Sequence, residues 1–180
     1  MQNTYCYLLF YLALTSVVKA NEQQATTGPT LNGYGPTFAV HNKDVELPEG
    51  FIYKAVFDIS KTPDDKSQYN YSIESLARFI NMHTRNGVKI GHIKLAAVFH
   101  GSASKNALNH AAYKKRYGTS NPNLELIKQL SDLGVDFYIC GQSAGFNGID
   151  KNELDSHIKL GLSAMTMFVL LQEEGYKLIP

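Results

Sequence analysis

Apolar residues between positions 51 and 180 fall into short, mostly apolar runs, separated by stretches in which they recur at helical spacing. The runs predict strands over residues 51–59, 93–99, 135–140, 158–162 and 176–179. The first two runs have the pattern of strands buried on both faces. Helical stretches between successive strands predict a parallel-type sheet with right-handed crossover connections.

Helical spacing and capping residues predict where the connecting helices lie. They are expected over residues 72–86, 107–117, 122–133 and 165–174, with a helical turn over 152–157 and a glycine-rich loop after residue 140. Ser72 and Asn121 are the expected N-caps, with Pro122 at the first position of its helix. The sequence therefore predicts a single-domain α/β layered fold, with a roughly five-stranded, mainly parallel sheet and helices on both faces.

Residues 21–50 form a polar lead-in segment ahead of this domain. The segment is dense in Thr, Gly, Pro and Asn, which is typical of loops. Residues 38–40 are the one short piece expected to be extended. The predicted organisation is residues 1–20, then the lead-in 21–50, then the α/β domain 51–180.

Residues 1–20 have the pattern of a signal peptide. Residues 5–18 are uncharged and mostly apolar, and this run is shorter than the roughly 20 residues that span a bilayer. Val18 and Ala20 occupy the −3 and −1 positions of a cut after Ala20, although residues 1–4 contain no Lys or Arg. The pattern predicts a periplasmic or secreted protein that has no membrane association after cleavage. An uncleaved anchor or a buried N-terminal helix is the alternative interpretation.

Charge and cysteine content narrow the function classes. The 180 residues include 17 Lys and Arg against 16 Asp and Glu, a net charge of +1. This balance lacks the basic excess that nucleic-acid binding needs. Cleavage after Ala20 would remove Lys19 and Cys6, leaving 160 residues with no net charge and one cysteine, Cys140. A protein with one cysteine has no internal disulfide, even in an oxidising compartment.

Cys140 is the strongest candidate for a reactive residue. It ends the third predicted strand, and parallel sheets place ligand sites beyond the carboxyl ends of their strands. Gly141, Gln142 and Ser143 follow it and leave backbone amides free to face a ligand or the sulfur. Amides directed at a sulfur favour the thiolate, which can hold a further sulfur atom as a persulfide. The alternative is a buried structural cysteine.

His100 follows the neighbouring strand and is the second candidate. It can donate a proton to a departing group or, as a cation, stabilise the Cys140 thiolate, and it can equally close a strand by bonding a carbonyl. His83 lies on the apolar stripe of its helix and is expected to be a core residue. The other histidines show no ligand spacing, and the sequence has neither a nucleotide-binding glycine motif nor a hydrolase elbow. We therefore expect no metal and no cofactor.

Several segments occur together in an order that resembles the DsrE/DsrF-like family, specifically its exported branch. They are residues 76–82, 98–101, 121–124, 135–143, 162–166 and 175–180. The resemblance covers about residues 51–180 and implies a five-stranded α/β fold that assembles into trimers or hexamers. It also implies sulfur relay through a cysteine after the third strand, which Cys140 matches. His100 matches a residue common in the exported branch. The Gly141-Gln142-Ser143 segment differs from the loop of the cytoplasmic relay members.

The leading hypothesis is an extracytoplasmic sulfur-handling protein, a sulfurtransferase or a sulfur carrier, in which Cys140 carries sulfane sulfur as a persulfide. His100 and Gly141, Gln142 and Ser143 would tune the thiolate and bind the incoming sulfur. The expected partners are a small sulfur-containing anion, or a sulfur donor or acceptor protein, and further copies of the chain. A non-catalytic oligomeric binding module with a structural Cys140 is the alternative, and a redox sensor that pairs Cys140 between subunits is a third reading.

Overall fold

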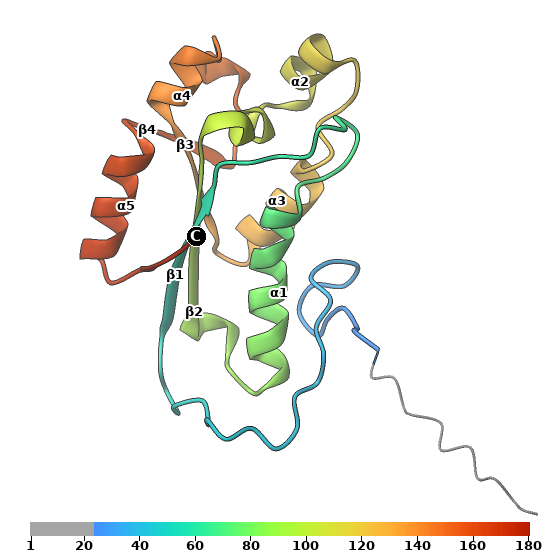
Figure 1. Ribbon diagram of the computed structural model, residues 1–180, viewed down its shortest axis with the longest axis vertical. Helices are drawn as coiled ribbons and strands as arrows, with labels where there is room; N and C mark the ends of the chain where they lie inside the picture. The colour runs from blue at the N-terminus through green and yellow to red at the C-terminus, as the bar shows by residue number, and fades with distance from the viewer. Residues whose placement is uncertain (1–23) are drawn as a thin grey trace, which may run out of the picture.

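The computed structural model describes residues 24–180 and shows a five-stranded sheet in which every neighbouring pair of strands is parallel (Figure 1). The strand order is β4-β3-β2-β1-β5. The strands are β1 (Tyr53–Ile59), β2 (Ile93–Phe99), β3 (Asp136–Cys140), β4 (Ile158–Gly161) and β5 (Lys177–Ile179). This confirms the predicted parallel sheet. The predicted signal peptide, residues 1–20, lies outside the described residues.

Helices cover both faces of the sheet, as predicted. They are α1 (Tyr71–Arg85), α2 (His110–Tyr117), α3 (Leu124–Asp132), α4 (Gly141–Phe146) and α5 (Ala164–Glu173), with 3-10 helices at η1 (Ile90–His92), η2 (Gly101–Ala107) and η3 (Lys151–Glu153). In Figure 1 the sheet is seen nearly edge-on, with α1 and α3 on one side and α5 on the other. Helices α2 and α4 lie near the end of the sheet where the strands finish.

The alternation of side chains along the strands divides the core between the two faces. In β2, Leu95 and Phe99 belong to the large cluster that includes α1 and α3, whereas Ala96 and Val98 belong to a smaller cluster that includes α5 residues. Because successive strand residues point to opposite faces, a continuous apolar run such as β2 is buried on both. This is why the run could be recognised in the sequence.

Two predicted helix caps are wrong. Asn70, not Ser72, caps α1, because its side chain accepts a hydrogen bond from the Ser72 N–H at 2.9 Å. Helix α3 begins at Leu124, after the predicted start. The Asn121 amide instead donates to two backbone carbonyls of the preceding segment, those of Asn106 and Leu108, so it holds the loop ahead of the helix.

Three helical boundaries also differ from the prediction. The expected helix over 107–117 begins three residues later, as α2, since Asn109 caps it by accepting from the Ala112 N–H at 2.9 Å, and residue 107 instead ends η2. The expected turn over 152–157 is the shorter η3. The glycine-rich segment after Cys140, predicted as a loop, forms helix α4.

The lead-in is loop-like within its described part, residues 24–50, but it packs against the domain. Its backbone pairs with itself at one isolated bridge, between Thr26 and Thr37, and residues 38–40 form no strand. Leu31 is buried in the main core. Asn81 of α1 is fully buried and bonds the lead-in backbone. Other α1 side chains also bond this segment, among them Arg85, which donates to the carbonyls of Thr26, Gly28 and Thr37.

The outer face of α5 carries large apolar side chains in contact with solvent. They include Met165, Val169 and Leu170, and Leu162 of the preceding segment is exposed as well. Such a surface suits burial against another protein chain, and the homo-oligomer expected from the sequence stays a prediction. Among residues 24–180, none of the helices has both the length and the apolar character needed to cross a membrane.

Candidate functional site

Three adjacent strands place polar side chains on the α5 face of the sheet at its carboxyl edge. Asp58 of β1 pairs in register with Val98 of β2, and Val98 pairs with Tyr138 of β3. His100 lies two residues beyond Val98, and Cys140 lies two residues beyond Tyr138. Residues two apart along a strand direction point to the same face of the sheet. The register therefore brings Asp58, His100 and Cys140 to one end of one face.

A cavity of about 350 Å³ forms over these residues. Helix α5 and the segment before it supply the opposite wall. The lining residues are Asp58, His100, Cys140, Gln142, Ser163, Ala164, Met165 and Phe168. The Phe168 ring meets the His100 ring edge-on, with centroids 6.4 Å apart. The two residues ranked highest from sequence, Cys140 and His100, thus share one cavity.

Residue Cys140 is only 5% exposed, and it lies at the start of helix α4. Its sulfur accepts a hydrogen bond from the Ser143 N–H at 3.4 Å. Burial raises the pKa of the Cys140 thiol, but hydrogen bonds from the Ser143 side chain and from the N–H groups of Ser143, Ala164 and Gln142 outweigh it. The pKa consequently lies below its usual value, and a larger fraction of the group is the nucleophilic thiolate at neutral pH.

Ser143 links the Cys140 sulfur to the segment that follows strand β2. Its hydroxyl oxygen accepts from the Gly101 N–H at 3.2 Å, which leaves the hydroxyl proton free to point to the sulfur. Gly101 adopts a left-handed φ of 53° directly after His100. The segments that follow β2 and β3 are therefore joined at the cavity.

Replacing Ser143 with alanine removes one of the hydrogen bonds that favour the thiolate. The pKa of Cys140 should rise, so the midpoint of a plot of alkylation rate against pH should move to higher pH. Iodoacetamide labelling followed by mass spectrometry measures this. Ser102→Ala is a matched control, because the Ser102 hydroxyl donates to the Ser60 carbonyl and not to the sulfur. An unchanged midpoint in Ser143→Ala would refute the assigned role of the hydroxyl.

His100 is held by a carboxylate that the sequence analysis did not identify. Its Nε2 lies 2.6 Å from Asp58 Oδ1, and the two side chains are 28% and 31% exposed. In the sequence, Asp58 is the single acidic residue of the predicted strand over residues 51–59. It is the penultimate residue of β1 and pairs with Val98, two residues before His100. A carboxylate at such a position orients an imidazole.

The predicted substrate-binding residues take different positions. Gln142 lines the Cys140 cavity, and its side-chain amide donates to the Leu162 carbonyl at 3.3 Å. Ser143 lines a second hollow of about 430 Å³, which Gln142 lines as well. Gly141 lines neither hollow and instead packs closely against the end of β4. Phe146 also lines the second hollow and is 92% exposed.

The other predicted histidine assignment holds. His83 is buried in α1, where its Nδ1 bonds the Phe79 carbonyl at 2.8 Å and its ring stacks on the Phe79 ring at 4.0 Å. This is the satisfied core histidine expected from the apolar stripe.

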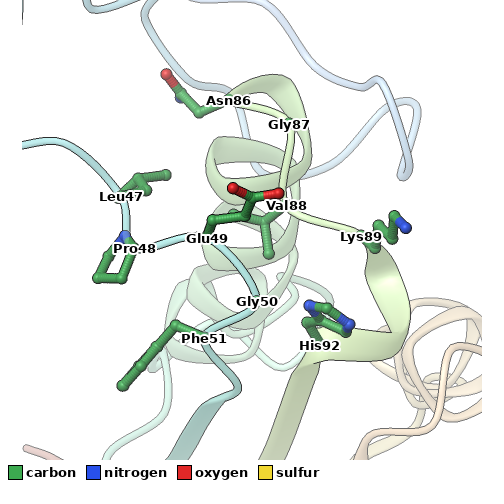
Figure 2. A pocket seen from close by; sticks show the side chains of 10 residues that line it. All are labelled: Leu47, Pro48, Glu49, Gly50, Phe51, Asn86, Gly87, Val88, Lys89 and His92. Carbon is green, nitrogen blue, oxygen red and sulfur yellow. The ribbon is translucent and has the colours of Figure 1, made fainter.

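A larger hollow of about 450 Å³ lies at the opposite, amino-terminal edge of the sheet. Figure 2 shows it between the segment that leads into β1 and the turn that follows α1. The charged residues on its wall, Glu49 and Lys89, are solvent-exposed, and it contains His92 but no cysteine. Its volume exceeds that of the Cys140 cavity, yet it does not bring together a nucleophile and an oriented proton donor.

Comparison with known proteins identifies the family. The model of the DsrE/DsrF-like family matches residues 54–180. The chain belongs to the DsrE/DsrF-like family. No curated protein sequence matches it. This family is commonly linked with sulfur relay, and in this member the thiol of Cys140 lies at the carboxyl edge of the sheet.

Two solved structures share the DsrE-like fold. The protein of unknown function MTH1491 from Methanobacterium thermoautotrophicum superposes with a TM-score of 0.52 at 17% identity, covering 71% of this chain and 97% of that one. The ychN protein from E. coli superposes with a TM-score of 0.51 at 14% identity, covering 71% of this chain and 98% of that one. At these identities the likeness establishes the fold, and function must be argued from the site.

Proposed function

We propose that this protein handles sulfur outside the cytoplasm by accepting sulfane sulfur on Cys140 as a persulfide and passing it on. The observation that carries the proposal is a thiol of lowered pKa that lines a cavity at the carboxyl edge of the sheet together with an oriented imidazole. Membership of a family linked with sulfur relay supports it. The exported location rests on the signal-peptide pattern of residues 1–20.

The chemistry needs no oxidant and no cofactor. The Cys140 thiolate attacks the outer sulfur of a hydropersulfide R–S–SH, a new S–S bond forms on Sγ, and the bond to the R-bearing sulfur breaks. The departing R–S⁻ takes up one proton and leaves as a thiol. Attack by a thiolate on a sulfur–sulfur bond is the same type of exchange that interconverts disulfides.

The charge of the cavity indicates which donors suit it. Of the described residues, those that line the cavity include the carboxylate Asp58 but neither Lys nor Arg. A dianion such as thiosulfate would lose its hydration there without a cation to replace it. We therefore expect a hydropersulfide, alone or attached to a partner protein, to be a better donor than thiosulfate.

The proposal is tested by the intact mass of the purified protein after incubation with an alkyl hydropersulfide. We expect the mass of one added sulfur atom, lost again on treatment with a reducing thiol, and slower addition from thiosulfate at equal concentration. Cys140→Ser should abolish the addition. Cys6→Ser is the matched control and should retain it in any preparation that keeps residues 1–20.

The alternative, a binding module with a structural cysteine, is favoured by one observation. Cys140 is buried in the same small cluster as Val56, Ala96 and Val98. That reading predicts no sulfur addition to the wild type, or equal addition to Cys140→Ser, and either result would refute the persulfide proposal. It also predicts that alkylation of Cys140 in the native protein is slower than in the unfolded chain.

A further inference from the structure

We propose that Asp58 is a positioning residue that fixes the tautomer of His100, so that the Nδ1–H of the imidazolium protonates the thiolate leaving the sulfur donor. This inference rests on the proposed function and deepens it, since it assigns the source of the proton in the sulfur-transfer step. It adds Asp58 to the residues that sequence analysis had selected.

The contact between the two side chains determines which ring nitrogen is available. Nε2 of His100 and Oδ1 of Asp58 are 2.6 Å apart. An ionised carboxylate can only accept hydrogen bonds, so Nε2 is the donor. Within residues 24–180, Nδ1 of His100 has no hydrogen-bond partner. The nitrogen that remains for chemistry is thus Nδ1, on a ring that lines the cavity.

The separation of His100 from the thiol fits a leaving-group acid. In the part of the chain that the structure describes, no hydrogen bond joins the imidazole to the Cys140 sulfur, although both line the cavity. In thiol–persulfide exchange the attacking, transferred and leaving sulfurs lie roughly in line. With S–S bonds of about 2 Å, the leaving sulfur lies about 4 Å from Sγ. The acid must therefore stand beyond the transferred sulfur and not against the nucleophile.

The step balances without a further reactant. Sγ⁻ and R–S–SH give Sγ–SH and R–S⁻, the Nδ1–H proton passes to R–S⁻, and a neutral imidazole bonded to the Asp58 carboxylate remains. Sγ is oxidised from the thiolate to the persulfide level and the R-bearing sulfur is reduced from the persulfide to the thiolate level, so no external oxidant or reductant is needed and one S–S bond replaces another. His100 regains its proton from water, to which both members of the pair are partly exposed.

Donors that differ in their leaving thiol distinguish this role from a structural one. An alkyl thiolate is basic and needs a proton to leave, whereas a nitrophenyl thiolate is a weak base and leaves without one. General acids typically contribute about 10²–10⁴-fold in rate. Asp58→Asn should therefore slow sulfur transfer from an alkyl hydropersulfide at least about tenfold, and transfer from a nitrophenyl hydropersulfide less than about threefold.

The experiment follows single-turnover sulfur addition to the purified protein by intact mass, with both donors. Asp136→Asn is the matched control, because Asp136 is also a strand carboxylate but pairs with Lys159 at 2.7 Å and does not line the cavity. Its rates should equal those of the wild type. Should Asp58→Asn fail to fold, His100→Gln removes the proton donor itself and is expected to show the same donor-dependent loss.

Equal slowing of Asp58→Asn with both donors, or no slowing with the alkyl donor, would overturn the role of Asp58. The proposed function would still stand as long as the wild type gains sulfur. A wild type that gains no sulfur from either donor overturns both. A loss confined to the alkyl donor is the result that supports the proposal.

Discussion

Asn81→Ala is expected to lower the free energy of unfolding by roughly 3 kcal/mol or more, because several buried backbone groups would lose their partners at about 1–3 kcal/mol each. Asn81 is fully buried in α1. Its Oδ1 accepts from the N–H groups of Thr30 and Leu31, at 3.2 and 2.8 Å. Its Nδ2 donates to the carbonyls of Leu31, Tyr34 and Gly35, at 2.9, 2.9 and 3.2 Å.

The loss of stability in Asn81→Ala should be concentrated in the lead-in segment. Without the Asn81 amide the segment around Leu31 can regain hydrogen bonds only by detaching into water, which exposes Leu31. We therefore expect faster hydrogen exchange and faster proteolysis within residues 24–37, together with a lower urea midpoint for the whole protein. Met82→Ala is the control, since Met82 is the next residue of α1 and is 43% exposed. Similar unfolding energies for the two variants would contradict this account of how the lead-in is attached.

This attachment shows why the sequence identified the lead-in as a loop but not its place in the fold. Turn residues report local backbone preference, whereas Asn81 and Leu31 are 50 positions apart. The sequence alone does not distinguish a buried asparagine in a helix from an exposed one. The partners of a side-chain amide become known only when the backbone that it bonds has been placed.

The sheet was predictable because its signal is local and repeated. The first two strands are mostly apolar runs, and the helices between successive strands require parallel pairing with crossovers. The same logic placed Cys140 and His100 at one edge. Asp58 was missed because its importance comes from register, which joins it to Val98 and so to His100. The register between two strands cannot be determined from the sequence of either strand alone.

Helix α4 was missed for a different reason. Glycine and small polar residues have low helix propensity, so the segment after Cys140 favoured a loop. In the structure, the Cys140 sulfur accepts the Ser143 N–H at the start of the helix, and Gly141 lies against the end of β4. Tertiary packing thus outweighs the local preference. Because α4 supplies two of the amides that bond the sulfur, this helix sets the chemistry of the thiol.

Two glycines of α4 should respond to the same substitution with opposite signs. A Cβ on Gly141 would lie 2.6 Å from the Gly161 carbonyl oxygen and 3.0 Å from that of Leu162. These are backbone atoms of β4 and the residue after it, so the helix or the strand must shift. Overpacking of this kind costs about 1–3 kcal/mol. A Cβ on Gly145 would meet nothing within 4 Å, and alanine favours a helix over glycine by up to about 1 kcal/mol.

We therefore expect Gly141→Ala to lower the urea midpoint and Gly145→Ala to raise it slightly. The first variant should also move the amides of Gln142 and Ser143 away from the sulfur, which raises the pKa of Cys140 and slows its alkylation at neutral pH. Gly145→Ala should leave alkylation as in the wild type. If both variants changed stability in the same direction, the close approach of α4 to β4 would not be what requires glycine at position 141. If Gly141→Ala loses both stability and thiol reactivity and Gly145→Ala loses neither, then the close contact of Gly141 with the backbone at the end of β4 positions the amides that favour the thiolate.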